Sequence, residues 1–326
     1  MTVLWLLYLV QAAYAEKITR QENLMLKERC YSKWTGNQET MSQIVPGTSE
    51  QWDFNMQANK YRRQPVNQSN YPFAVALSWI LGTRYDPIRG KDVVNFTTPV
   101  CSGVLISPRH ILTAAHCLTV NDTNACKKGL PVQEKTAQEV GVFLYSCNDL
   151  QCWRSQGVLR AASVHVHRDY VKKACGEYYK YDIGVIELEE NAYSSPICMP
   201  QWNDFVPHTV ESIGYGKNGE DDSIQAVAYA MITEKPEDNT IEAFTKYKNE
   251  GSIGGDSGGP LVKKLNDKHY LLGILSAEGT KTQPLLVSSV FVDVRKYLDW
   301  ICIITGVCPL IGDSMEYEPP FFTGLG

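Results

Sequence analysis

A serine set among glycines is the residue of this 326-residue chain whose surroundings best suit a nucleophile. It is Ser257, within the run Gly-Asp-Ser-Gly-Gly-Pro at residues 255–260. Glycine lets the backbone turn tightly and approach a substrate closely. The backbone N–H groups of Gly255 and Ser257 could then donate to one developing negative oxygen. Because a serine hydroxyl alone is a weak nucleophile, this chemistry also needs a base and an acid that orients the base.

Two further motifs supply these partners. Thr-Ala-Ala-His-Cys at residues 113–117 contains His116, and Asp-Ile-Gly-Val-Ile-Glu-Leu at residues 182–188 contains Asp182. Histidine, aspartate and serine follow one another in one of the known orders of a Ser-His-Asp triad. In order and spacing the three motifs resemble those of the trypsin/chymotrypsin-like serine peptidases, and the resemblance runs from about Tyr71 to Ile301.

The resemblance implies an all-β fold of two six-stranded antiparallel Greek-key barrels followed by a C-terminal helix. Short β-rich runs alternate with turns from Tyr71 onward, as such a fold requires. Near the end, Val294, Tyr297, Leu298 and Ile301 recur with a helical period, so we predict an amphipathic helix there.

In the mechanism that the resemblance implies, Ser257 attacks a peptide carbonyl while His116 takes its proton and later returns it to the leaving amine. Asp182 holds the imidazole in the right tautomer, and Ser276 matches a serine that bonds near this aspartate. Gly255 and Ser257 form the oxyanion hole. No cofactor and no metal are expected.

The activation signal of the family is missing. Members expose an Ile-Val-Gly-Gly N-terminus whose amine pairs with the aspartate before the nucleophile, here Asp256. That terminus is expected near Lys60, where residues 59–64 read Asn-Lys-Tyr-Arg-Arg-Gln. The two arginines are either a processing site or a polar linker. Without a cation beside it, a buried Asp256 would be costly, and the oxyanion hole would collapse.

The substrate-binding positions also depart from the family. Gly251 stands where trypsins carry an aspartate, so a trypsin-like preference is not expected. Ala277 and Glu278 follow Ser276 where the family has Trp-Gly, and Ser289 stands at a second glycine position. These changes narrow the pocket, and we predict a preference for small side chains or for basic ones that reach Glu278.

Ten cysteines indicate an oxidising compartment. The resemblance implies two bridges, Cys101–Cys117 and Cys30–Cys198, the second of which keeps a pro-segment attached. For the other six, the short-loop pairs Cys147–Cys152 and Cys302–Cys308 are plausible, but sequence alone does not fix the pairing. A zinc site is the alternative for such clusters, although no histidine has finger-like spacing.

The family's bridge in the nucleophile loop is absent, because Ile253 stands at its position. We therefore expect the second barrel to rely on packing alone and to be the looser half. The other histidines, His110, His165, His167, His208 and His269, have no motif around them and are expected at the surface.

The chain divides into four parts. Residues 1–15 resemble a secretory signal peptide, residues 16–60 a pro-segment with a short helix near Glu22–Glu28, residues 61–308 the peptidase domain, and residues 309–326 a disordered tail. The pro-segment also resembles those of a divergent nematode branch of secreted trypsin-like proteins. Asn67, Asn95 and Asn121 stand in glycosylation motifs.

Together these features predict a secreted, glycosylated, monomeric serine endopeptidase, made as a zymogen, that acts on peptides or proteins. An activating protease and an inhibitor are its expected partners. The net charge of −5 gives no sign of nucleic-acid binding, and no segment after the signal peptide is suited to span a membrane. The alternative is a protease-like binding protein with little or no turnover, favoured by the missing activation terminus.

Overall fold

The computed structural model describes residues 17–30, 64–66, 68–87, 90–120, 128, 130, 132–145, 152–153, 157–173, 178–216, 227–233, 239–245, 251–266, 268–278 and 287–309. Several predictions made from the sequence lie outside these residues. They concern the signal peptide, the activation terminus near Lys60, the tail after Pro309, Asn67, Asn121, Cys126, Cys147 and Cys175.

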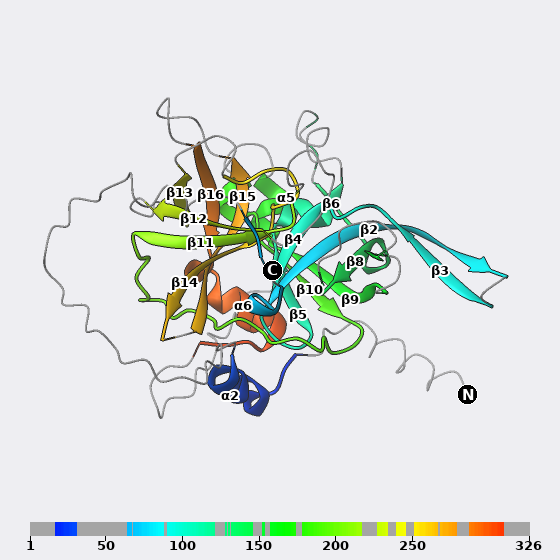
Figure 1. Ribbon diagram of the computed structural model, residues 1–326, viewed down its shortest axis with the longest axis horizontal. Helices are drawn as coiled ribbons and strands as arrows, with labels where there is room; N and C mark the ends of the chain where they lie inside the picture. The colour runs from blue at the N-terminus through cyan, green and yellow to red at the C-terminus, as the bar shows by residue number, and fades with distance from the viewer. Residues whose placement is uncertain are drawn as a thin grey trace, which may run out of the picture.

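Two antiparallel sheets dominate the described part of the chain (Figure 1), and six strands of each close into a ring. The first ring runs in the order β2 (Ala74–Asp86), β4 (Cys101–Leu105), β5 (His110–Thr113), β10 (Gly184–Leu188), β9 (Leu159–Val166) and β8 (Val140–Phe143), and β8 pairs back to β2. β3 (Lys91–Phe96) pairs with the outer half of β2.

The second ring runs β12 (Val227–Thr233), β11 (Thr209–Gly214), β14 (Pro260–Leu265), β15 (Lys268–Glu278), β16 (Val287–Asp293) and β13 (Thr240–Thr245), and β13 pairs back to β12. The short β1 (Gln64–Pro65) lies against β12, while β6 (Thr119–Val120) and β7 (Gln133–Glu134) form a separate pair. The predicted fold of two antiparallel six-stranded barrels is confirmed.

One apolar core is shared by both barrels. Val75, Leu112 and Ile186 of the first barrel belong to the same buried cluster as Ile274 and Val292 of the second. Strands β4, β5 and β10 are buried along their whole length, although they include the polar residues Ser102, His110 and Glu187. The boundary between the two barrels is therefore well packed, and it can hold Ser257 and His116 in fixed positions.

The hairpin of β2 and β3 projects from the first barrel (Figure 1). The sequence predicts a strand over the run from Tyr71 to Leu77, but β2 continues to Asp86. Beyond Ser78 the strand leaves the core, and Leu81 is 67% exposed.

The helix predicted over Glu22–Glu28 is confirmed as α2 (Arg20–Arg29). It begins with a capping box, in which Thr19 accepts from the Glu22 N–H and the Glu22 carboxylate accepts from the Thr19 N–H. Cys30, directly after α2, is bonded to Cys198. Disulfides also join Cys101 to Cys117 and Cys302 to Cys308.

The C-terminal helix α6 covers Leu298–Thr305 and begins later than predicted. Asp293 caps a 3₁₀ turn at Val294–Lys296 by accepting from the Arg295 N–H, and Tyr297 then has ψ 9°, outside the helical region. Other helical elements within the described residues are α5 (Arg168–Lys173) and the 3₁₀ turns at Gln68–Asn70, Ala115–Leu118, Ala137–Glu139 and Tyr178–Tyr181.

Two of the histidines expected at the surface are buried, so that expectation is wrong for them. His110 is paired through Nδ1 with the Ser107 hydroxyl, and His269 packs against the rings of Tyr71 and Phe73. His110 lies on β5, which is buried on both faces, and His269 is the buried residue between the half-buried Lys268 and Tyr270 on β15. No local motif records either placement. No helix within the described residues combines the length and apolar character needed to cross a bilayer.

Candidate active site

Strand pairing explains why His116 and Asp182 meet. β10 pairs with β5 so that Gly184 lies opposite Thr113. Asp182 precedes Gly184 by two residues, and His116 follows Thr113 by three, in the 3₁₀ turn that ends β5. Both side chains therefore emerge at the same end of the first barrel.

Asp182 is fully buried and accepts three hydrogen bonds. Its Oδ1 accepts from the His116 backbone N–H at 2.8 Å, and its Oδ2 lies 2.7 Å from His116 Nδ1. Ser276, on β15 of the second barrel, donates its hydroxyl to Oδ2 at 2.6 Å. Because a carboxylate only accepts, Nδ1 carries the proton and Nε2 is left as a base.

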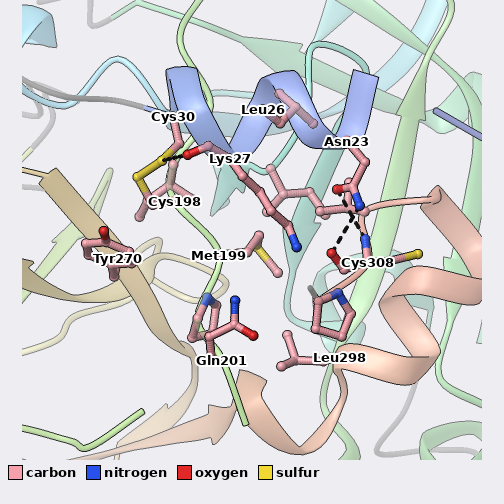
Figure 2. Close-up of a pocket in the computed structure, with 15 residues that line it drawn as sticks. Asn23, Leu26, Lys27, Cys30, Cys198, Met199, Gln201, Tyr270, Leu298 and Cys308 are labelled. Atoms are coloured by element: carbon pink, nitrogen blue, oxygen red, sulfur yellow. Dashed lines mark hydrogen bonds between the residues drawn. A yellow bond between two sulfur atoms is a disulfide. The ribbon is translucent and has the colours of Figure 1, made fainter. Parts of the chain in front are cut away.

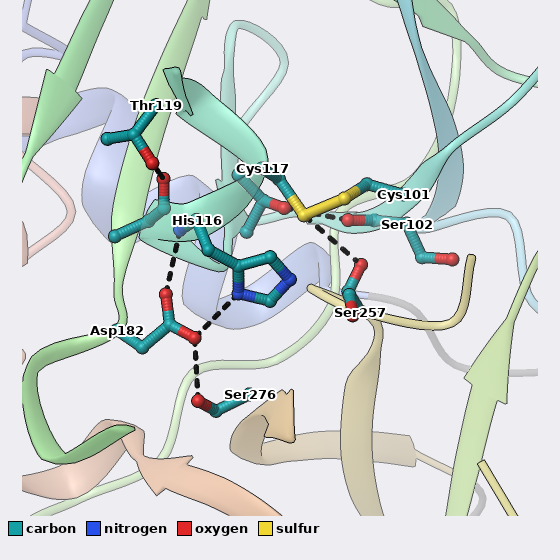
Figure 3. A network of polar contacts seen from close by, with 10 residues as sticks. Cys101, Ser102, His116, Cys117, Thr119, Asp182, Ser257 and Ser276 are labelled. Atoms are coloured by element: carbon teal, nitrogen blue, oxygen red, sulfur yellow. Dashed lines mark hydrogen bonds and ion pairs between the residues drawn. A yellow bond between two sulfur atoms is a disulfide. The ribbon is translucent and has the colours of Figure 1, made fainter. Parts of the chain in front are cut away.

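Ser257 lies on the other side of the imidazole (Figure 3). Its carbonyl oxygen accepts from the Ser102 N–H at 2.7 Å and lies 3.6 Å from Cys117 Sγ, next to His116 in sequence. The His116 side chain is 29% exposed, so the base is open to a substrate while its partner Asp182 is not.

The nucleophile loop leaves two N–H groups uncommitted. The N–H groups of Asp256, Gly258 and Gly259 all donate to backbone carbonyls. Among the described residues, no acceptor pairs with the N–H of Gly255 or of Ser257. Gly255 has φ +101°, which a residue with a side chain rarely adopts. These are the two N–H groups that the sequence singles out for the oxyanion hole.

The carboxylate of Asp256 is held by the backbone. It is fully buried, with Oδ1 accepting from the Gly216 N–H at 2.7 Å and Oδ2 from the Ile253 N–H at 2.9 Å. A Cβ on Gly214 would lie 2.3 Å from Oδ1, so only glycine leaves room for this carboxylate. Two backbone N–H dipoles thus stabilise the charge of Asp256.

Ser102 is a site residue that sequence reasoning missed. Its hydroxyl donates to the Gly255 carbonyl at 2.8 Å and accepts from the Tyr215 N–H at 2.8 Å, while its own carbonyl accepts from Thr113. The second barrel therefore does not rely on packing alone, because a first-barrel serine also holds its nucleophile loop by a hydrogen bond. That this barrel is the looser half stays a prediction. No spacing in the sequence connects residue 102 with residue 255.

One cluster has the spacing of a metal site among the described residues, namely Cys101, His116 and Cys117. The two cysteines are bonded to each other, so neither offers the thiolate that a metal would need. This cluster belongs to the histidine loop and is no metal centre.

Comparison with known proteins places this geometry in a family. A family model described as Trypsin matches residues 82–301, more than half of the chain. The chain belongs to the trypsin family of serine endopeptidases. The narrower resemblance to a nematode branch stays a prediction.

Similar proteins include Ovochymase of Halocynthia roretzi, 28% identical over 275 residues that cover 78% of this chain and 16% of that protein. Phenoloxidase-activating enzyme 1 of Spodoptera litura is 30% identical over 230 residues, covering 63% of this chain and 59% of that protein. Mannan-binding lectin serine protease 1 of Mus musculus is 28% identical over 240 residues, covering 64% and 32%. The chain therefore spans between 16% and 59% of the length of these relatives.

The residues predicted from the sequence to line the substrate pocket lie as follows. The Ser289 hydroxyl lies 2.6 Å from the Ser252 hydroxyl, and both residues are buried. Gly251, beside Ser252, is buried as well. Ala277 is half-buried, and the backbone of Glu278 pairs with Ser289 across β15 and β16. Sequence reasoning identified Ser289 but missed its partner Ser252.

Proposed function

We propose that this chain is a secreted serine endopeptidase that hydrolyses peptide bonds through an acyl-enzyme on Ser257. The observation that carries the proposal is the combination of the His116–Asp182 hydrogen bonds with the two uncommitted N–H groups of Gly255 and Ser257. These groups are the base and the oxyanion donors that attack by the Ser257 hydroxyl would need.

In the first half of the reaction, Nε2 of His116 takes the Ser257 proton as the hydroxyl attacks the peptide carbonyl. The negative oxygen that forms accepts from the N–H groups of Gly255 and Ser257. The buried charge of Asp182 stabilises the imidazolium, which then protonates the leaving amine. Water hydrolyses the acyl-enzyme by the same steps, with His116 again as the base.

The pair of hydroxyls at Ser252 and Ser289 supports a preference for small P1 side chains. The two hydroxyls are hydrogen-bonded to each other. The Ser289 side chain also fills space that would be empty in a trypsin-family member with glycine at this position. A large aromatic side chain would have to displace this buried, paired couple, at a cost of about 1 to 3 kcal/mol for each group left without a partner.

We further propose that residues 16–60 are a pro-segment and that the chain is a monomeric zymogen. The Cys30–Cys198 bond supports this, because a cut after Cys30 and before β1 would leave α2 attached to the protease. An activating protease and an inhibitor are the partners this implies. Asn67, Asn95 and Asn121 are the proposed glycosylation sites.

Labelling with a fluorophosphonate probe tests the proposal. The secreted protein and a Ser257→Ala variant are labelled before and after limited proteolysis. Labelling that requires Ser257 supports the peptidase, and labelling that also requires proteolysis supports the zymogen. A folded sample that stays unlabelled under both conditions would overturn the proposal and leave the protease-like binding protein.

A further inference from the structure

A cavity of about 230 Å³ lies between α2 and the barrels, away from the proposed peptidase site (Figure 2). Its walls are α2, the segment 197–201, Tyr270 of β15, Leu298 of α6 and residues 307–309. None of the residues lining it is His116, Asp182 or Ser257. Its use therefore does not depend on the proposed function.

Two contacts, here called clamps, fix α2 beside the cavity, one near each end of the helix. Cys30 is bonded to Cys198, and one turn before Lys27 the Asn23 side chain donates to the Cys308 carbonyl at 3.1 Å and accepts from the Cys308 N–H at 3.3 Å. Asn23, Lys27 and Cys30 are four and three residues apart, so they share one face of the helix. Lys27 thus projects from a fixed position between the two clamps.

The ammonium of Lys27 has no partner within the described residues. Its Nζ is buried, and no hydrogen-bond acceptor reaches it. Figure 2 shows this nitrogen inside the cavity, between Met199 and Cys308. The described residues that line the cavity include no aspartate or glutamate. Burial lowers the pKa of Lys27 to about 8. A buried cation without a counter-ion is costly, and an anion supplied from outside would relieve that cost.

The rest of the lining defines what else the ligand must carry. Leu26, Ile197, Met199 and Leu298 give the cavity an apolar wall. The amide of Gln201 faces the same space in Figure 2 and offers a second polar contact. A cavity of about 150 Å³ is known to hold benzene, so this one has room for a slightly larger molecule.

We propose that this cavity binds a small apolar monocarboxylate, whose carboxylate pairs with Lys27 Nζ and whose hydrocarbon body contacts Met199 and Leu298. Such a ligand joins α2 to the barrels through contacts on both sides. Its binding therefore stabilises the docked position of α2.

Calorimetry with hexanoate tests this, with hexanamide as a neutral analogue of the same size. The full-length protein should bind hexanoate at least tenfold more tightly than hexanamide. Lys27→Met should lower hexanoate affinity about tenfold or more, since 1.4 kcal/mol corresponds to a factor of ten. The matched control is Lys17→Met, because Lys17 is an exposed lysine of the same segment. It should bind hexanoate as the natural protein does.

Hydrogen exchange provides a readout that needs no variant. Hexanoate should slow exchange of the α2 amides in the natural protein, and hexanamide should not. Equal affinity for the two compounds, no saturable hexanoate binding in the millimolar range, or unchanged hexanoate affinity in Lys27→Met would overturn the proposal. If Lys27→Met does not fold, the comparison of hexanoate with hexanamide on the natural protein still decides.

Discussion

Replacing Ser102 by alanine removes one hydroxyl that bonds two backbone groups. The half-buried Gly255 carbonyl loses its donor, and the buried Tyr215 N–H loses its acceptor. Each buried group left without a partner costs about 1 to 3 kcal/mol. We therefore expect Ser102→Ala to lower the free energy of unfolding by about 1 to 3 kcal/mol through the buried Tyr215 N–H, with a smaller further loss through the half-buried Gly255 carbonyl.

Ser78→Ala is the matched control. Ser78 is a serine of the same barrel, also fully buried, and its Oγ has no hydrogen-bond partner among the described residues. Its removal should change the free energy of unfolding by less than about 1 kcal/mol, or raise it. Urea denaturation measures both variants.

Ser102→Ala should also affect the reaction itself. The Gly255 carbonyl shares a residue with an oxyanion donor, and losing one such donor costs about a hundredfold or more in rate. In Ser102→Ala the Gly255 N–H is displaced and not removed. We therefore expect fluorophosphonate labelling of the folded variant to slow by about tenfold or more. Equal stability losses in the two serine variants, with labelling unchanged in both, would refute the argument that Ser102 holds the loop.

Gly214→Ala places a Cβ 2.3 Å from Asp256 Oδ1. This variant should therefore lower the free energy of unfolding by about 1 to 3 kcal/mol and abolish fluorophosphonate labelling. The control is Gly254→Ala, whose added Cβ meets nothing within 4 Å and which should change neither stability nor labelling. The pKa of His110 is lowered from 6.5 to about 4, mainly because the ring is buried and secondly because of the charge of Arg109. The unfolded chain therefore takes up a proton first as pH falls, and stability should be full above about pH 6.5 and drop by about 3 kcal/mol towards pH 4. Urea titrations at both pH values should show a smaller drop in His110→Leu, and an undiminished drop counts against this assignment. Ser289→Gly should shift P1 preference towards larger side chains in a peptide library, and an unchanged preference would show that the hydroxyl pair does not limit the pocket.

The residues of the candidate site could be named from the sequence because the chemistry constrains them locally. A nucleophile on a tight turn requires glycines beside it, and the N–H groups of Gly255 and Ser257 follow from that turn. The two barrels were predictable through the family resemblance that these motifs carry, and the observed register of β5 and β10 brings His116 and Asp182 together.

The supports of the site were not predictable in the same way. Ser102 contacts Gly255 across 153 residues, and Ser252 contacts Ser289 across 37, with no periodicity to reveal either pair. A hydroxyl in a strand has the same appearance in the sequence whether it is unpaired, like Ser78, or bonded on two sides, like Ser102. Only the three-dimensional closure of the barrels decides between these states.

The attachment of α2 has a consequence for the order in which the molecule assembles. The helix is among the first described segments to be synthesised, yet its covalent partner Cys198 follows 168 residues after Cys30, and Cys308 follows 285 residues after Asn23. The Ile18 N–H likewise donates to the carbonyl of Thr305. A chain emerging from the ribosome therefore carries α2 without its docking surface until almost the whole described sequence has been made. Docking of α2 is therefore a late event. It can occur only after the strands of both barrels, which lie in the sequence between α2 and Cys308, have been made.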